Sequence, residues 1–496
     1  MKKVSTMVFI SVSSVLLLAA CSGSNGDSEE EKELHLELPL KTTSIAPYET
    51  DVPVQAGAAE SLFKMTTDGK LENLLVEEYE QPSPEQLELT LKDDITFQNG
   101  EKLTGEKVKK SLEHSLEESD LVKGSLPIED IEADGQNVTI TTEYEYPELI
   151  SELASPFAAI YDVDGEGDIE ETPVGTGPYQ VTDYKRTQQI TLEKNEDYWQ
   201  GEPKLDGVKV TYQEDGNTRV SNLESGKADI ITDVPVEKVE SIDGNDQTKI
   251  SKTSGFRTSL LLYNHTSDKM TKPVREALDK LIDRESIAEE ISAGYAKPAT
   301  GPFNDSLDFI EDTTPEEQDI EAAKELLEEE GYMKDNPLKL QFATYDGRPE
   351  LPKIAQVIQS DAKEANVEID VRNVDDIESY LEDKDQWDAT MYSFGTIPRG
   401  DTGYFFNQAY QVDGAINKGD YENDKVVELI DELNETVGQD ERADVANEIM
   451  DESAKDLPNS YITYNDQIAG LSEKVENFEV SPEGIYLLDY QVDLSE

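Results

Sequence analysis

The apolar positions of this chain recur with two periods, every second residue in some segments and every third or fourth residue in others. The first period is typical of strands and the second of amphipathic helices. Alternating or continuous apolar positions predict strands at residues 34–38, 87–91, 138–140, 179–184, 208–212, 228–231, 259–264, 338–342, 367–371, 389–394 and 461–464. Helical spacing predicts helices at residues 58–63, 217–224, 272–282, 284–292, 320–330, 351–364, 424–437 and 441–455, and a further helix after Thr104. The alternation of strand and helix along residues 338–371 indicates an α/β fold.

The first 33 residues carry a different pattern. Two lysines, an apolar segment over residues 8–20 and small residues before Cys21 predict a secretory signal peptide at residues 1–20. The apolar segment is shorter than the run of about 20 residues that a membrane-spanning helix needs. Leu18-Ala19-Ala20-Cys21 resembles a bacterial lipobox, which implies cleavage before Cys21 and lipid attachment to it. An ordinary signal peptide with an incidental cysteine is the alternative. Residues 21–33 are small, polar and acidic, and predict a tether.

Chain length, cysteine content and net charge limit the classes of protein to which this chain can belong. A chain of 496 residues is too long for one core, so two or more lobes are expected. Cys21 is the only cysteine, which excludes disulfides and a thiolate metal site. The chain has 110 acidic and 43 basic residues, a formal net charge of -67, which excludes a basic surface for nucleic acid. Acidic residues occur along the whole sequence, so we favour a high-salt or alkaline habitat over cation binding as their explanation.

Few residues point to catalysis or direct metal binding. The sequence has no nucleophile elbow, no His-Glu-x-x-His and no His/Cys pair, so we predict no enzyme and no cofactor. A carboxylate pair for hydrolysis remains an alternative. The histidines His35, His114 and His265 are far apart in sequence, and His265 is the best single metal-ligand candidate. A metal is therefore expected to arrive already chelated.

Five segments in order resemble the peptide/nickel-binding family of the solute-binding lipoproteins of ABC importers. They are residues 91–112, 175–179 with Asn195 and Tyr198-Trp199, Arg219 with 223–229, 274–284, and 322–332. The resemblance implies a two-lobed α/β clamp like the periplasmic binding proteins, with an extra subdomain in its first lobe. Lobe I is expected at residues 34–255, with the subdomain at about 66–168, and is completed by 476–496; lobe II is expected at 256–475.

The resemblance also implies a function. A monomeric receptor, anchored through Cys21 to the outer face of a bacterial cell membrane, would capture a small solute between its lobes and deliver it to membrane permease subunits. The solute is expected to be a nickel-type metal chelate, with a short peptide as the alternative. An extracellular hydrolase and a structural surface lipoprotein are more distant alternatives.

The residues of the predicted cleft follow from this family pattern. Phe394-Gly395 resembles the aromatic–glycine opening of the nickel-type loop, with Phe in place of a more usual Trp. Peptide-binding relatives carry an early loop aspartate, whereas this chain has Pro398 there and Asp401 later. The nickel-type arginine is replaced by Ser155, and Arg399 or Arg257 is expected to supply the positive charge for carboxylates. Tyr404 and Tyr263 complete the expected lining.

Overall fold

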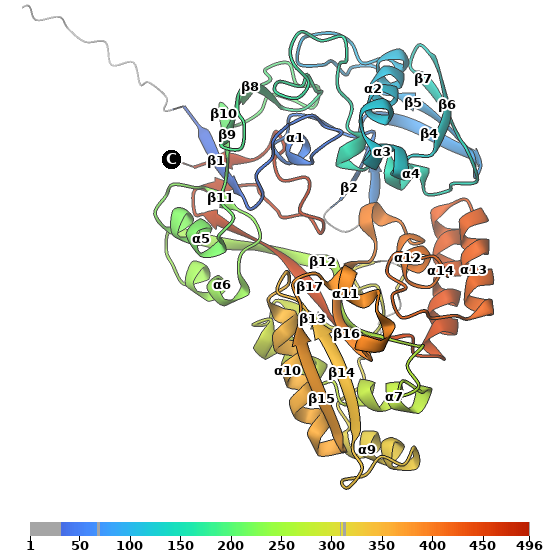
Figure 1. Cartoon of the computed structure of the whole chain (residues 1–496). Coiled ribbons are helices and arrows are strands. Elements are labelled where there is room, and N and C mark those ends of the chain that lie inside the picture. Colours follow the sequence, from blue (N-terminus) through green and yellow to red (C-terminus); the bar gives the residue numbers. More distant parts are fainter. Residues whose placement is uncertain (1–30, 67–69, 308, 311–313, 496) are drawn as a thin grey trace, which may run out of the picture. The chain divides into compact units, whose positions relative to one another are not determined.

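A mixed sheet of eleven strands, counted over the described residues, runs through the structure (Figure 1). The structure is a computed structural model that describes residues 31–66, 70–307, 309–310 and 314–495, so the predicted signal peptide and Cys21 lie outside the described residues. The strand order is β15-β14-β16-β12-β17-β11-β1-β10-β9-β8, and β13 pairs with β17. The strands are β1 (Glu33–Leu38), β8 (Tyr179–Lys185), β9 (Gln189–Lys194), β10 (Gly207–Tyr212), β11 (Ile230–Ile231), β12 (Thr248–Tyr263), β13 (Ala296–Pro298), β14 (Leu338–Thr344), β15 (Val367–Asn373), β16 (Ala389–Gly395) and β17 (Asn459–Ser472).

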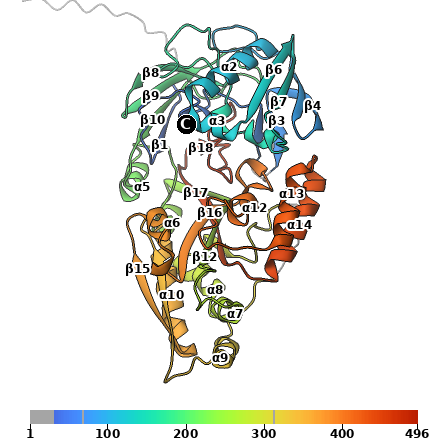
Figure 2. The same ribbon diagram turned by 45° about the vertical axis from the view of Figure 1, so that its right-hand side comes forward.

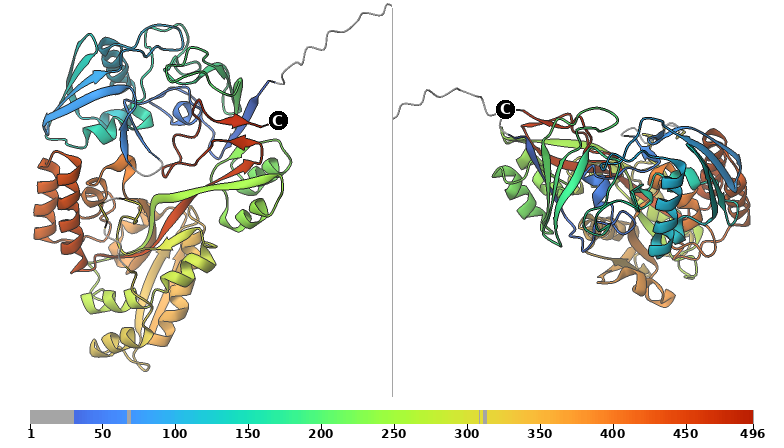
Figure 3. Two further views of the ribbon diagram at one scale, coloured as in Figure 1. Left: turned by 180° about the vertical axis from the view of Figure 1, so that it is seen from behind. Right: turned by 90° about the horizontal axis from the view of Figure 1, so that it is seen from above.

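The long antiparallel strands β12 and β17 connect the two halves of this sheet (Figures 2 and 3). Towards one end β17 pairs with β11, and towards the other end β12 pairs with β16. Their pairing shifts register between Ser254 and Arg257 and again between Ser259 and Leu260. We call the elements from β1 to α6, together with residues 475–495 that pack in the same core, the first half, and those from α7 to α14 the second half; β12 and β17 run through both. The predicted lobe boundary at 255/256 falls inside β12, and the domain limits remain predictions.

A second, four-stranded sheet with a covering helix lies inside the range predicted for the extra subdomain. Its strands follow the order β4 (Val76–Ser83), β5 (Gln86–Leu91), β7 (Asn137–Thr142) and β6 (Ile128–Asp134). Alternation along β5 buries Leu87, Leu89 and Leu91 on one face. Helix α2 (Gly105–Glu118) begins after Thr104, whose side chain accepts a hydrogen bond from the Lys107 N–H.

Helices lie beside the sheets in both halves (Figure 1). Most follow the predicted apolar spacing, which buries one side of each helix. None of the described helices is long and apolar enough to cross a membrane. The helices and small strands are α1 (Val52–Gln55), β2 (Phe63–Met65), β3 (Leu71–Asn73), α3 (Asp120–Ser125), α4 (Leu149–Glu152), α5 (Gly216–Glu224), α6 (Val236–Asp243), α7 (Lys272–Lys280), α8 (Arg284–Ser286), α9 (Ile320–Glu329), α10 (Glu350–Ala362), α11 (Ile377–Leu381), α12 (Tyr404–Ala409), α13 (Asp424–Glu435), α14 (Gln439–Ala454), β18 (Val475–Glu476) and β19 (Asp493–Leu494).

Two predicted elements are wrong or incomplete. Residues 58–63 do not form a helix. Glu60 forms an isolated antiparallel β-bridge with Ile160, and Phe63 begins β2. Gly57 has a φ of 70°, which ends the helical turn of α1 just before this segment. The helix predicted at 284–292 starts as α8 and continues as a π-helical turn over Ile287–Ile291.

The glycine-rich turn at residues 175–178 crosses closely over the segment after α1. A Cβ on Gly177 would lie 2.3 Å from the Gly57 carbonyl oxygen, so a side chain requires the backbone to move. We expect Gly177→Ala to lower the free energy of unfolding by about 2 kcal/mol or more. Gly124→Ala is the control, because within the described part of the chain a Cβ on this glycine of helix α3 would meet no atom of another segment within 4 Å, and it should stabilise slightly. Urea titration compares the two, and equal midpoints would contradict the close crossing.

Candidate ligand-binding cleft

The charges of two arginines, Arg257 and Arg348, repel each other, and neither arginine forms an ion pair within the described residues. Arg257 is on β12 opposite Gly395 of β16, and its guanidinium donates to the Ser393 carbonyl oxygen at 3.2 Å. Arg348 lies in the turn between β14 and α10. Among the residues that the structure describes, no carboxylate forms an ion pair with either guanidinium. Burial lowers the pKa of Arg257 and the charge of Arg348 lowers it further, while Tyr345, Glu350 and Asp233 oppose the shift.

Two stacked aromatic rings belong to the same part of the structure as Arg257. Phe394 at the end of β16 and Tyr404 at the start of α12 stack with their ring planes 7° apart and centroids separated by 5.7 Å. Both side chains are half-buried, so part of each ring faces outward. Burial raises the pKa of the Tyr404 hydroxyl, and the charges of Arg399 and Arg257 act against this rise. We call Arg257, Arg348, Phe394 and Tyr404 the arginine–aromatic wall.

A cavity of the first half carries the opposite charge. It has a volume of about 440 Å³, and its lining includes Thr42, Asp233, Gln467 and Glu483. Asp233 is exposed and has a φ of 49°, a left-handed conformation that is uncommon for a residue with a side chain. Its negative charge acts on Arg257, which relates this cavity to the arginine–aromatic wall.

Arg399 joins the two halves instead of standing free. Its guanidinium forms an ion pair with Glu152 of α4, a buried carboxylate of the first half. Its backbone N–H donates to Glu483 Oε1 at 2.7 Å. Arg399 adopts a φ of 54°, so two contacts with the first half hold it in the left-handed region. Burial raises the pKa of Glu152, and Arg399 counteracts this rise.

The structure brings Phe394, Tyr404 and Arg257 together, with Arg399 nearby on the same loop. It places the other candidates in different environments. Asp401 is buried and accepts from the Gly403 N–H at 2.8 Å, while Ser155 is buried and its Oγ accepts from the Phe157 N–H at 3.4 Å.

Tyr263 is the last residue of β12 and His265 follows the strand, whereas Arg257 lies inside it. Tyr263 is fully buried and its hydroxyl lies 2.5 Å from Ser460 Oγ, which makes it a packing residue in this conformation. His265 Nε2 lies 3.0 Å from the Pro458 carbonyl oxygen, and burial lowers the pKa of the ring to about 4. Within the described residues, no group of three or more His, Cys, Asp or Glu side chains is placed to hold a metal ion. The ligand contacts of all these residues stay predictions.

Sequence reasoning missed Arg348. The signal was present, because Gly347-Arg348-Pro349 follows the strand predicted at 338–342 and precedes a predicted helix. Ligands of open α/β sheets bind outside the carboxyl ends of strands, which is where this turn lies. The lack of an acidic partner, in contrast, becomes visible only in three dimensions.

The fold is that of a solute-binding protein. Residues 70–417 match the family model of the bacterial extracellular solute-binding proteins, family 5 Middle, and the chain belongs to this family. It is 61% identical over 482 residues to the nickel-binding protein NikA of Staphylococcus aureus (strain NCTC 8325 / PS 47), covering 97% of this chain and 98% of the relative. The glutathione-binding protein GsiB of Escherichia coli (strain K12) is 30% identical over 319 residues, 61% of this chain and 62% of that protein.

Solved structures agree with this family. The crystal structure of NikA from Staphylococcus aureus in complex with Ni(L-His)2 has a TM-score of 0.75 at 63% identity, covering 94% of this chain and all of that chain. The nickel ABC transporter structure from Bacillus halodurans has a TM-score of 0.87 at 35% identity, with the same shares covered. The predicted family and the predicted two-lobed α/β class are confirmed. These relatives are binding proteins of transporters rather than enzymes.

Proposed function

We propose that this chain is the receptor of an ABC importer and captures nickel already chelated by small carboxylate-bearing molecules such as histidine. The observation that carries the proposal is the pair Arg257 and Arg348, which has no acidic partner among the described side chains although the chain contains 110 acidic residues. Guanidinium groups bind carboxylates bidentately, so the two arginines suit a solute with two carboxylates.

The remaining chemistry of the cleft fits such a chelate. Ni²⁺ prefers imidazole nitrogen, and two histidine molecules supply imidazoles, amines and carboxylates together. The stacked faces of Phe394 and Tyr404 offer flat apolar contact to imidazole rings. Asp233 and Glu483, in the opposite cavity, are acceptors for the amine N–H groups. The nickel complex bound to the Staphylococcus aureus relative has this composition.

A short peptide is the second candidate solute. Arg257 and Arg348 could bind the carboxyl terminus of a peptide, which needs a cation. Asp233 and Glu483 could bind its amino terminus, which needs an anion. The similarity to a glutathione-binding relative supports this alternative at lower identity. It differs from the first candidate in needing no metal.

The proposal includes the location and partners of the receptor. Cleavage before Cys21 and lipidation of Cys21 would anchor it, as a monomer, on the outer face of the cell membrane beside the permease subunits. Residues 22–33 would act as the tether. The acidic composition supports a high-salt or alkaline habitat.

The test compares solutes on the full chain with Cys21→Ser, so that no lipid attaches. Calorimetric titrations use Ni²⁺ alone, histidine alone, Ni²⁺ with two equivalents of histidine, and glutathione. We expect the nickel–histidine mixture to bind at least about 100-fold more tightly than Ni²⁺ alone, because only the mixture brings carboxylates to the arginines. Equal affinity for Ni²⁺ alone, or tighter binding of glutathione, would overturn the proposal.

A further inference from the structure

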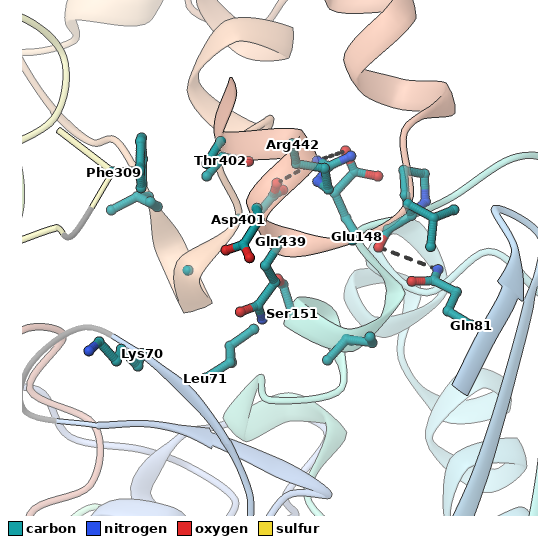
Figure 4. A pocket seen from close by; sticks show the side chains of 18 of the residues that line it. Lys70, Leu71, Gln81, Glu148, Ser151, Phe309, Asp401, Thr402, Gln439 and Arg442 are labelled. Atoms are coloured by element: carbon teal, nitrogen blue, oxygen red, sulfur yellow. Dashed lines mark hydrogen bonds and ion pairs between the residues drawn. The ribbon is translucent and has the colours of Figure 1, made fainter. Parts of the chain in front are cut away.

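A buried cluster of three charged side chains lies where the first and second halves meet, outside the proposed cleft (Figure 4). Arg442 Nη2 lies 2.8 Å from Glu148 Oε1 and 3.4 Å from Asp401 Oδ1. The exposed fractions of Glu148, Asp401 and Arg442 are 7%, 6% and 7%. Two carboxylates thus share one guanidinium in a place with little water, and one negative charge remains uncompensated when both are ionised.

The three side chains come from segments far apart in sequence. Glu148 precedes α4 of the first half, whereas Asp401 lies in the loop before α12 and Arg442 on α14 of the second half. Separating the halves would therefore leave Arg442 with Asp401 and return Glu148 to water. The Arg442–Glu148 ion pair is a contact that exists only while the halves touch here.

The backbone is shaped to admit this cluster. A Cβ on Gly403 would lie 2.8 Å from Glu148 Oε1 and 2.9 Å from Arg442 Nη2, so a side chain at this position would displace both groups. The Gly403 N–H also donates to Asp401 Oδ1 at 2.8 Å. The φ of Gly403 is -83°, so the missing side chain, and not an unusual backbone conformation, is what the cluster requires.

The cluster also borders a cavity. Glu148, Asp401 and Arg442 line a cavity of about 570 Å³, together with Gln81 and Gln439 (Figure 4). Water in such a space allows the buried carboxylates to exchange protons with the solvent.

We propose that Glu148, Asp401 and Arg442 form a proton-dependent clasp between the first and second halves. The clasp holds the two halves together when one carboxylate is protonated and loosens when both carboxylates are ionised. When one carboxylate is protonated, the charge of the other carboxylate is balanced by the charge of Arg442. When this proton is lost to water, both carboxylates are negatively charged and repel each other across the contact.

Burial raises the pKa of both carboxylates of the clasp, and the nearby arginines oppose this rise. Burial and the charge of Asp401 raise the pKa of Glu148 to about 7, against the lowering effect of Arg442. Burial also raises the pKa of Asp401, against Arg442 and Arg399. Other charged or titratable groups on the elements packed around the clasp are Tyr144, Tyr146, Glu152, Arg399, Tyr404, and the cavity residues Lys70, Tyr79, Glu80 and Asp440.

The sign of the pH dependence follows from the raised pKa. Contact raises the pKa of Glu148 from the ordinary value of 4.5 to about 7, so contact favours the protonated carboxyl. The clasp is therefore fully effective below about pH 4.5 and weakens as the pH rises to about 7. In the pH range above 7, the contact carries the full cost of the second buried charge.

The test measures the separation of the two halves in the full chain without nickel. The background is Cys21→Ser, which removes the only cysteine, with spin labels on Leu121→Cys and Val412→Cys. These side chains are 58% and 61% exposed, and each half carries one of them, Leu121 on α3 and Val412 after α12. Pulsed electron paramagnetic resonance compares distance distributions at about pH 5 and about pH 8.5.

We expect the ratio of separated to clasped molecules to rise by about tenfold or more between the two pH values. Glu148→Gln mimics the protonated carboxyl and should remove this pH dependence, with Asp401→Asn as a second variant should the first fail to fold. Asp440→Asn is the matched control, because it removes the same charge from an exposed position at the cavity rim and should leave the shift intact. An unchanged distribution in the background chain, or a persistent shift in Glu148→Gln, would overturn the clasp. Since no nickel is present, the result does not depend on the proposed solute.

Discussion

Substituting methionine for Arg257 is expected to weaken binding of the nickel–histidine chelate by about 100-fold or more. Arg257 is half-buried and interacts electrostatically with Arg348 and Tyr404, so its charge acts on a carboxylate with little screening by water. Methionine keeps most of the length and apolar contact of the side chain and removes only the charge and the donors. Calorimetric titration with Ni²⁺ and two equivalents of histidine measures the effect.

The same substitution separates binding from folding. Arg348 disfavours the charged form of Arg257, so Arg257→Met relieves repulsion and should leave the free energy of unfolding unchanged or raise it. Arg372→Met is the matched control, because it removes the same charge from an exposed residue on β15 that contacts Tyr380. Unchanged chelate affinity in Arg257→Met, or an equal loss in Arg372→Met, would contradict the role of the arginine–aromatic wall.

The sequence was sufficient to predict most individual elements, because burial on one face leaves a period of two in strands and about 3.6 in helices. It could not predict the sheet order. Strand β1 lies between β10 and β11, which follow it by more than a hundred residues, and such pairing depends on the whole chain. The helix predicted at 58–63 failed because the turn at 175–178 packs against this segment, a tertiary contact that local spacing does not record.

Some residues of the candidate cleft could be predicted from the sequence, but their burial and ion pairs could not. Phe394 and Tyr404 were found through the loop pattern, and their stacking agrees with a shared surface. Tyr263 and Arg257 lie on one strand, but only the structure reveals that Tyr263 is fully buried. The ion pair between Arg399 and Glu152 joins residues 247 positions apart, so no local motif could have predicted it. Pairing of charges is a property of the folded chain rather than of sequence spacing.

Arg219 holds backbone segments that line the first-half cavity. Its substitution is expected to lower the stability of this region more than any other single substitution there. Its guanidinium is buried and donates to the carbonyl oxygens of Gln213 and Glu214 at 2.7 and 3.0 Å, and of Thr232 and Asp233 at 3.1 and 2.8 Å. Arg219→Met would leave these carbonyl groups without their donors. We expect the free energy of unfolding to fall by about 3 kcal/mol, measured by urea titration.

The effect should extend to binding, because the Arg219 guanidinium donates to the carbonyl oxygen of Asp233, whose backbone is in the left-handed region. Relaxation of Asp233 would move its carboxylate out of the cavity and weaken chelate binding by about tenfold. Arg186→Met is the control: Arg186 is exposed and its ion pairs with Glu170 and Glu171 span 3.5 and 3.9 Å, so its loss should change stability by less than about 0.5 kcal/mol. A chain with Arg219→Met that unfolds more easily but binds the chelate as before would separate the two effects and remove Asp233 from the proposed site.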